Sequence, residues 1–190
     1  MIITISQDRF HRELATFERT AFRLETRSSY KLGYEQVDFD LFLAGSPVPP
    51  PDRAWWRPWL EQIRRLTDEG KTVARVRVVD EPPTDYQRWE LWAHGWHEGA
   101  GEQISYLRKA DAITAGLPLG SDWWLLDEAR LIVIRYNEDG SILSKILTDD
   151  PGTIARHRAL RDLAVRHATT AGAILAALPE DTSCNRLENG

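Results

Sequence analysis

The run from Thr72 to Val79 (TVARVRVV) constrains the fold more than any other part of the sequence. Residues two apart in a strand share one face, and β-branched residues favour strands. On this alternation, one face of the strand is apolar and the other carries Arg75 and Arg77 between two valines. We therefore predict a strand with an apolar face and a face that bears two arginines.

Further apolar runs bring the predicted total to about five strands. They occupy residues 103–108, 123–127, 131–136 and 141–147. The last two runs flank Asn137-Glu138-Asp139-Gly140, a strong hairpin signal. Because both runs are apolar on both faces in places, we expect this hairpin to lie centrally in the sheet.

Helical periodicity predicts a similar number of helices. The predicted helices cover residues 7–20, 35–44, about 58–69, 85–97 and 151–177. Ser6, Thr84 or Asp85, and Asp150 before Pro151 are the expected N-caps. The segment 85–97 is also compatible with a strand, and 22–34 is expected to be irregular or a short extended piece.

This order of elements is not a strict βαβ alternation, so the predicted class is α+β. We expect a mixed sheet with flanking helices and a long C-terminal helix. The length fits a single domain over 1–178, followed by a polar tail, 179–190, that is expected to be disordered. Pro47 to Asp52 is a stiff connector; the alternative is a ligand for an SH3-like partner.

Composition and charge exclude several classes of protein. The net charge of −5 argues against a broad phosphate-binding surface, so we do not expect direct nucleic-acid binding. The single cysteine, Cys184, allows no disulfide within the chain and no cysteine-based zinc site. The start lacks the features of a signal peptide, and no run reaches the roughly 18 apolar residues of a membrane span. A cytoplasmic location fits these features.

Motifs for cofactor binding and nucleophilic catalysis are absent. The sequence contains no phosphate-binding glycine motif and no G-x-S-x-G elbow, so no cofactor is expected. His94, His97 and Glu98 form the one histidine cluster, but they do not follow a metal-protease spacing. We predict no metal site, and ordinary capping or surface histidines instead.

The best candidate for a ligand site surrounds the end of the 72–79 strand and the helix that follows it. A helix N-terminus and polar side chains together can hold an anion or a small polar ligand. The candidate residues are Arg75, Arg77, Thr84, Asp85, Tyr86, Arg88 and Glu90. A structural ion-pair network, with Asp85 as a helix cap, is the simpler interpretation.

Tryptophan-rich segments supply two further candidates. Trp123 and Asp127 belong to a possible ligand site, although an acid at the end of an apolar strand is more often a turn residue. Trp55 and Trp56 are adjacent, so their rings cannot share one helix face with Trp59. One of these rings is expected to be exposed, which suggests a protein interface.

Four separated blocks of the sequence occur in a recognisable order: residues 17–26 (FERTAFRLET), 75–79 with 83–90, 122–127 (DWWLLD), and Asp150-Pro151 with Arg156-His157-Arg158. Together they resemble an uncharacterised actinobacterial family, a domain of unknown function of the DUF6879 type. The resemblance covers about residues 10–168. It implies a place beside helix-turn-helix regulators and provides no catalytic residue to transfer.

A second resemblance is architectural. The expected strand, helix, strand and Trp-apolar-apolar-Asp block with a hairpin are similar to half of a phospholipase-D-like domain. Enzymes of that family need His-x-Lys followed by Asp, and this sequence contains no His-x-Lys. A relative of this kind would lack catalysis and would serve as a ligand or partner module.

These observations favour a non-enzymatic regulatory or ligand-sensing accessory protein that acts with a helix-turn-helix regulator. A homodimer and a small-molecule ligand are compatible with that role. The alternative is an enzyme of unrecognised type with a polar site near Arg77, Asp85 and Arg88. An enzyme would require a cleft in which such side chains converge with shifted pKa values.

Overall fold

The structure, a computed structural model, describes residues 1–178. The expected tail at 179–190 lies outside the described residues. Within residues 1–178, no helix combines the length and the apolar character that a membrane crossing needs.

The described residues contain one mixed sheet of seven strands, more than the five expected from the sequence. The strand order is β1-β7-β6-β5-β2-β3-β4. β2, β3 and β4 are parallel, and the other neighbours are antiparallel. The strands are β1 (Ile2–Thr4), β2 (Thr20–Glu25), β3 (Thr72–Val79), β4 (Gln103–Arg108), β5 (Asp122–Leu126), β6 (Arg130–Tyr136) and β7 (Ile142–Thr148).

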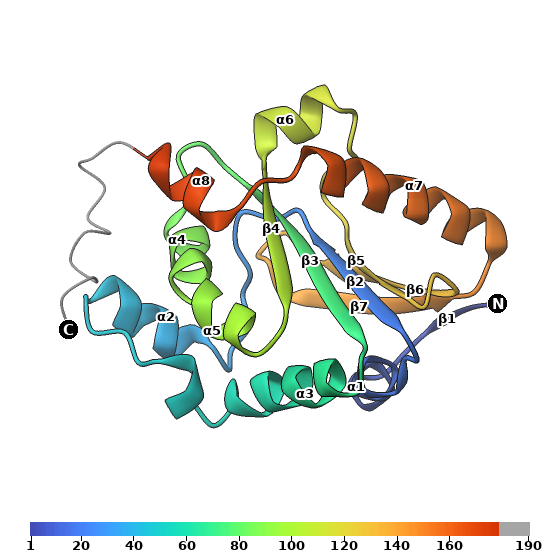
Figure 1. Cartoon of the computed structure of the whole chain (residues 1–190), viewed down its shortest axis with the longest axis horizontal. Coiled ribbons are helices and arrows are strands. Elements are labelled where there is room, and N and C mark those ends of the chain that lie inside the picture. The colour runs from blue at the N-terminus through green and yellow to red at the C-terminus, as the bar shows by residue number, and fades with distance from the viewer. Residues whose placement is uncertain (179–190) are drawn as a thin grey trace.

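Helices cover both faces of this sheet (Figure 1). The helices are α1 (Gln7–Thr16), α2 (Gln36–Leu43), α3 (Arg57–Asp68), α4 (Asp85–Trp92), α5 (His94–Gly99), α6 (Lys109–Thr114), α7 (Pro151–His167) and α8 (Ala171–Ala176). The helices before β4 gather on one face, and α6 and α7 lie on the other. α8 packs at the β4 edge, in a cluster with Leu91 of α4 and Tyr106 of β4. Pro50–Asp52, in the proline-rich connector, forms one 3-10 turn.

The start of the segment 22–34 takes the extended form, the second of the two alternatives expected for it, and belongs to β2, an interior strand of the sheet. β2 is bordered by β5 on one side and by β3 on the other. Arg23 and Glu25 alternate with apolar residues, but both charged side chains are turned into the protein. A charged face on a central strand does not match the usual apolar pattern of such strands, which is why the sequence left both alternatives open.

Two predicted helices are each divided in two. The helix expected at 85–97 breaks at Ala93 into α4 and α5. The helix expected at 151–177 ends at His167, because Thr169 exchanges backbone hydrogen bonds with Tyr106 of β4. Pairing with an edge strand draws the chain out of helical geometry, and Thr170 then caps α8.

The predicted caps are confirmed where they were most specific. Ser6 accepts a hydrogen bond from the backbone N–H of Arg9. Thr84 forms a capping box with Gln87 at the start of α4, and Asp150 caps α7 before a proline. The strands β3 and β4 have the predicted bounds.

The backbone at Gly101, between α5 and β4, requires a glycine. Its φ is +100°, and a Cβ placed there would lie 2.7 Å from Thr67 Oγ1. We therefore expect Gly101→Ala to lower the free energy of unfolding by about 1–3 kcal/mol. Urea unfolding checks this value.

Gly99 provides the matched control for that substitution. It ends α5, and no atom lies within 4 Å of a Cβ built on it. Gly99→Ala is expected to be neutral or to stabilise by up to about 1 kcal/mol. Equal losses in the two variants would contradict the steric argument for Gly101.

Candidate functional site

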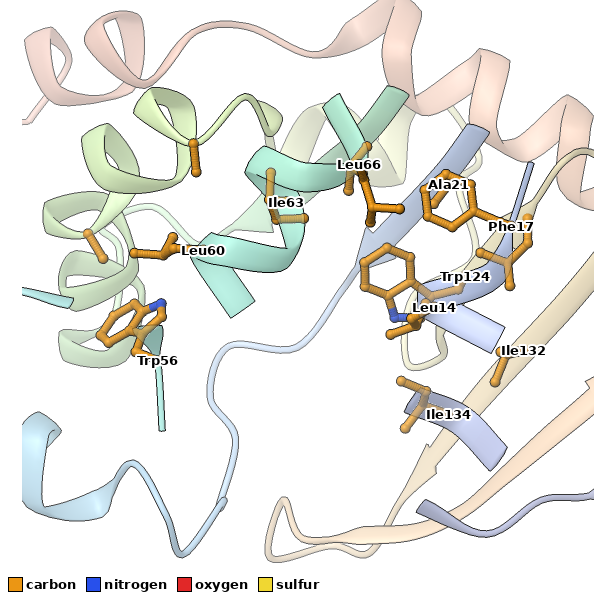
Figure 2. Close-up of a cluster of buried hydrophobic side chains, with 14 of the residues drawn as sticks. Leu14, Phe17, Ala21, Trp56, Leu60, Ile63, Leu66, Trp124, Ile132 and Ile134 are labelled. Atoms are coloured by element: carbon orange, nitrogen blue, oxygen red, sulfur yellow. The ribbon is translucent and has the colours of Figure 1, made fainter. Parts of the chain in front are cut away.

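A cavity of about 650 Å³ lies between the sheet and the helices that precede β4. Aromatic side chains from seven parts of the fold form much of its wall. They are Phe10, Tyr30, Tyr34, Trp55, Trp56, Trp59, Tyr86, Trp89, Trp124 and Tyr136. Figure 2 shows two of these side chains, Trp56 and Trp124, well separated from each other.

The floor of the cavity is the polar face of the central strands. Strand register places Trp124 of β5, Arg23 of β2 and Arg75 of β3 in one row. In the next row, Glu25 is the register partner of Arg77. All five residues line the cavity, so the alternation of each strand directs these polar groups into it.

Glu25 is the centre of a buried ion-pair network. Its Oε2 accepts hydrogen bonds from Arg75 Nη1 at 3.0 Å and from Arg77 Nε at 2.8 Å. Its Oε1 lies 2.8 Å from Arg23 Nη2. Burial alone would raise the pKa of Glu25, but the three guanidinium groups outweigh burial and hold it well below its usual range.

A second carboxylate, Glu102, continues this network toward the helices. Its Oε1 accepts hydrogen bonds from Arg75 Nε and Nη2, and its Oε2 is 2.7 Å from His97 Nδ1. Trp56 Nε1 donates to His97 Nε2 at 3.1 Å. Because Nε2 is an acceptor, Nδ1 carries the proton, and burial lowers the pKa of His97, so its imidazole is neutral at pH 7.

Two other glutamates in the cavity have raised pKa values. Burial raises the pKa of Glu90 to about 7, although Arg77 Nη2 lies 3.2 Å from its carboxylate. Burial also raises the pKa of Glu35 to about 8, despite the hydrogen bond that Tyr86 donates to it at 2.6 Å. The protonation state of both carboxyl groups therefore changes near neutral pH.

Two buried donors in the cavity wall lack an acceptor. Neither Trp124 Nε1 nor Arg23 Nε has a hydrogen-bond partner among residues 1–178. Trp124 is only 1% exposed. A buried donor without a partner costs about 1–3 kcal/mol, so such groups call for a ligand or for ordered water.

The structure brings four of the predicted ligand residues to this cavity and places three elsewhere. Arg75, Arg77, Tyr86 and Glu90 line it. The other three do not: Thr84 caps α4, while Asp85 and Arg88 pair with each other on the exposed side of that helix.

The second predicted pair lies away from the cavity. Trp123 faces the opposite layer and packs against Phe22 and His157. Asp127 accepts hydrogen bonds from the backbone N–H groups of residues 18–20, at 2.9, 2.7 and 3.1 Å. Asp127 therefore fixes the backbone that leads into β2.

The predicted interface tryptophans both belong to the cavity wall. Their rings are stacked, with centroids 4.8 Å apart. Trp56 is 7% exposed, while the partly buried Trp55 packs against the exposed Tyr34. Trp55 Nε1 donates to Asp38, which anchors the segment after α2.

The histidine cluster is divided between two environments. His97 belongs to the buried network, while His94 contacts Tyr106 and Glu98. Among the described residues, no group of three or more His, Cys, Asp or Glu side chains is arranged to hold a metal ion.

Sequence reasoning missed several residues of this cavity, above all Arg23, Glu25 and Glu35. The alternation of Thr20–Glu25 was the available signal for the first two residues. No local signal marks Glu35, which precedes α2 and reaches Tyr86 across 51 residues of chain.

Comparisons with known proteins confirm the family resemblance. A family model described as a domain of unknown function, DUF6879, matches residues 8–173. A search of curated proteins finds no match. Among solved structures, NucT from Helicobacter pylori has a TM-score of 0.47 and 8% sequence identity, and the alignment covers 90% of this chain and 97% of that chain. The match over residues 8–173 shows that the chain belongs to the DUF6879 family.

Proposed function

We propose that this protein is a non-enzymatic, ligand-sensing protein whose cavity holds one small, largely aromatic molecule. The observation that carries the proposal is the cavity of about 650 Å³ with its ten aromatic side chains. Ligand sites typically enclose about 300–1,000 Å³ and combine apolar walls with a few placed polar groups. The buried arginines and glutamates on the sheet supply those polar groups.

The aromatic wall is held in place before any ligand enters. Trp56 and Trp89 are 5.4 Å apart between ring centroids, and Tyr86 and Trp89 are 5.5 Å apart. Hydrogen bonds from Trp56 to His97 and from Tyr86 to Glu35 fix two of these rings further. Rings with little freedom lose little entropy when a flat molecule stacks on them, so the wall favours binding.

Calorimetric titration with a matched set of probes tests this function. The set is 2-naphthoate, 2-naphthamide and 2-naphthylmethylammonium, which share one ring system and differ in charge. We expect at least one probe to bind saturably, with one molecule per chain. Ala93→Phe, in the cavity wall, is expected to abolish that binding.

Ala110→Phe serves as the control, because it adds the same ring at an exposed position of α6. This control is expected to bind as the unmodified protein does. Circular dichroism establishes that both variants are folded. Failure of all three probes to bind would count against the proposal.

A protein partner belongs to the same proposal. The family resemblance implies a helix-turn-helix regulator as the partner. Binding of a ligand in the cavity would change the contact with this regulator. The adjacent Trp55 and Tyr34 link the cavity wall to the exposed surface and suit such a contact. The identity of the partner stays a prediction.

One observation favours the enzymatic alternative. Glu90 and Glu35 have pKa values of about 7 and about 8, which suit general acid–base groups. Mass spectrometry of a bound probe after prolonged incubation separates the two functions. A sensor returns the probe unchanged, whereas a converted probe would favour an enzyme.

A further inference from the structure

The two donors without acceptors are neighbours on the cavity floor. Arg23 and Trp124 are direct register partners across β2 and β5. The guanidinium carbon of Arg23 lies 5.5 Å from the centroid of the Trp124 indole. Both residues line the cavity, so the two donors without partners come from neighbouring positions on its floor.

The charge of the cavity wall favours an anion at that point. Four basic side chains, Arg23, Arg75, Arg77 and Lys145, line the cavity. Two carboxylates, Glu25 and Glu102, oppose them with pKa values that the arginines hold low, while burial raises the pKa of Glu35 to about 8 and that of Glu90 to about 7. The lining thus carries an excess of positive charge in a site of low dielectric, where charge is poorly screened.

An organic cation is the competing ligand, because aromatic boxes attract cations through the ring faces. The face of Trp124 is already used in this way, since the guanidinium groups of Arg23 and Arg75 lie 5.5 and 5.9 Å from its centroid. A second cation would meet these arginines directly. The like-charge contact opposes its binding at the floor.

We infer that the ligand is an aromatic carboxylic acid, bound as its monoanion, whose carboxylate accepts hydrogen bonds from Arg23 Nε and Trp124 Nε1. The inference rests on the proposed ligand-binding function and specifies the chemical class of its ligand. A carboxylate has two oxygens, one for each donor. A monoanion also limits the like-charge repulsion from the nearby Glu25 carboxylate. The ring of the ligand then stacks among the tryptophans of the wall.

Comparison of the three naphthalene probes tests the chemical class. We expect 2-naphthoate to bind about tenfold to a hundredfold more tightly than 2-naphthamide, because hydrogen bonds to a charged group are the strong ones. The ammonium probe is expected to bind most weakly. Equal affinities for the acid and the amide, or tightest binding by the cation, would overturn the inference while leaving the ligand-binding function intact.

Two tryptophan variants test the subsite itself. Trp124→Phe keeps an aromatic ring but removes the N–H donor, and we expect it to reduce the preference for acid over amide by about tenfold. Trp123→Phe, on the same strand but facing the opposite layer, is the matched control and should keep the full preference. Arg23→Gln is expected to reduce the preference as well. An unchanged preference in Trp124→Phe would overturn the assigned subsite.

Discussion

Glu25→Gln is expected to lower the free energy of unfolding by about 3–5 kcal/mol, the largest loss predicted for a single charge-removing substitution in this protein. Three guanidinium groups, those of Arg23, Arg75 and Arg77, lie within 3.0 Å of the Glu25 carboxylate. A glutamine keeps the shape and can accept hydrogen bonds, but it leaves the buried positive charges without their shared counter-charge. Urea unfolding with matched m-values measures the loss.

Two further variants isolate the cause of that loss. Glu69, which is exposed and pairs with Arg65 and Lys71 at the end of α3, is the control: Glu69→Gln should cost far less than Glu25→Gln, because solvent screens this pair. Arg77→Met, added to Glu25→Gln, should recover part of the loss, because one buried charge is removed and replaced by an apolar side chain. If Glu25→Gln costs no more than Glu69→Gln, the network does not stabilise the fold.

Glu35→Gln is expected to stabilise the protein at pH 8 by about 2–4 kcal/mol and to leave its stability unchanged near pH 4. The pKa of Glu35 rises from an ordinary value of 4.5 to about 8 in the folded state. Between these two values the folded chain keeps a proton that the unfolded chain has lost. The contribution of Glu35 to the free energy of unfolding is therefore fully present below about pH 4.5 and is lost as the pH rises through about 8. Between these values the free energy of unfolding falls by up to about 1.4 kcal/mol per pH unit.

The difference between the unmodified protein and Glu35→Gln, measured by urea unfolding at several pH values, isolates this group. Other titrating residues contribute to both proteins and cancel. The amide oxygen of the introduced glutamine can still accept the hydrogen bond that Tyr86 donates. Glu69→Gln is a control of opposite sign, because hydrogen bonds from Lys71 and Arg65 lower the pKa of Glu69. A difference that does not grow between about pH 5 and 8 would contradict the assigned protonation of Glu35.

Both substitutions are at residues, Glu25 and Glu35, whose burial and partners the sequence pattern does not predict. Arg75 and Arg77 could be placed on one face of a strand, because alternation is a local property of the chain. Their carboxylate partner, Glu25, could not be identified, since it lies 50 residues earlier than Arg75 in a strand that resembled an irregular segment. The predicted partners Asp85 and Arg88 are near in sequence, yet the helical spacing turns them to the outside of α4.

The sequence alone determined the local elements of this protein: the bounds of β3 and β4, the β6–β7 hairpin, and the caps at Ser6, Thr84 and Asp150. Each of these depends on residues within a few positions of one another, so backbone propensities and short hydrogen bonds suffice to specify them. The tertiary structure alone decided that β2 enters the centre of the sheet and that Arg23 and Trp124 become neighbours. It also decided that the helices before β4 enclose an aromatic cavity over them. The pairing of β2 with β3 and with β5 joins segments that are more than 50 residues apart, and only the packing of the whole chain brings such segments together.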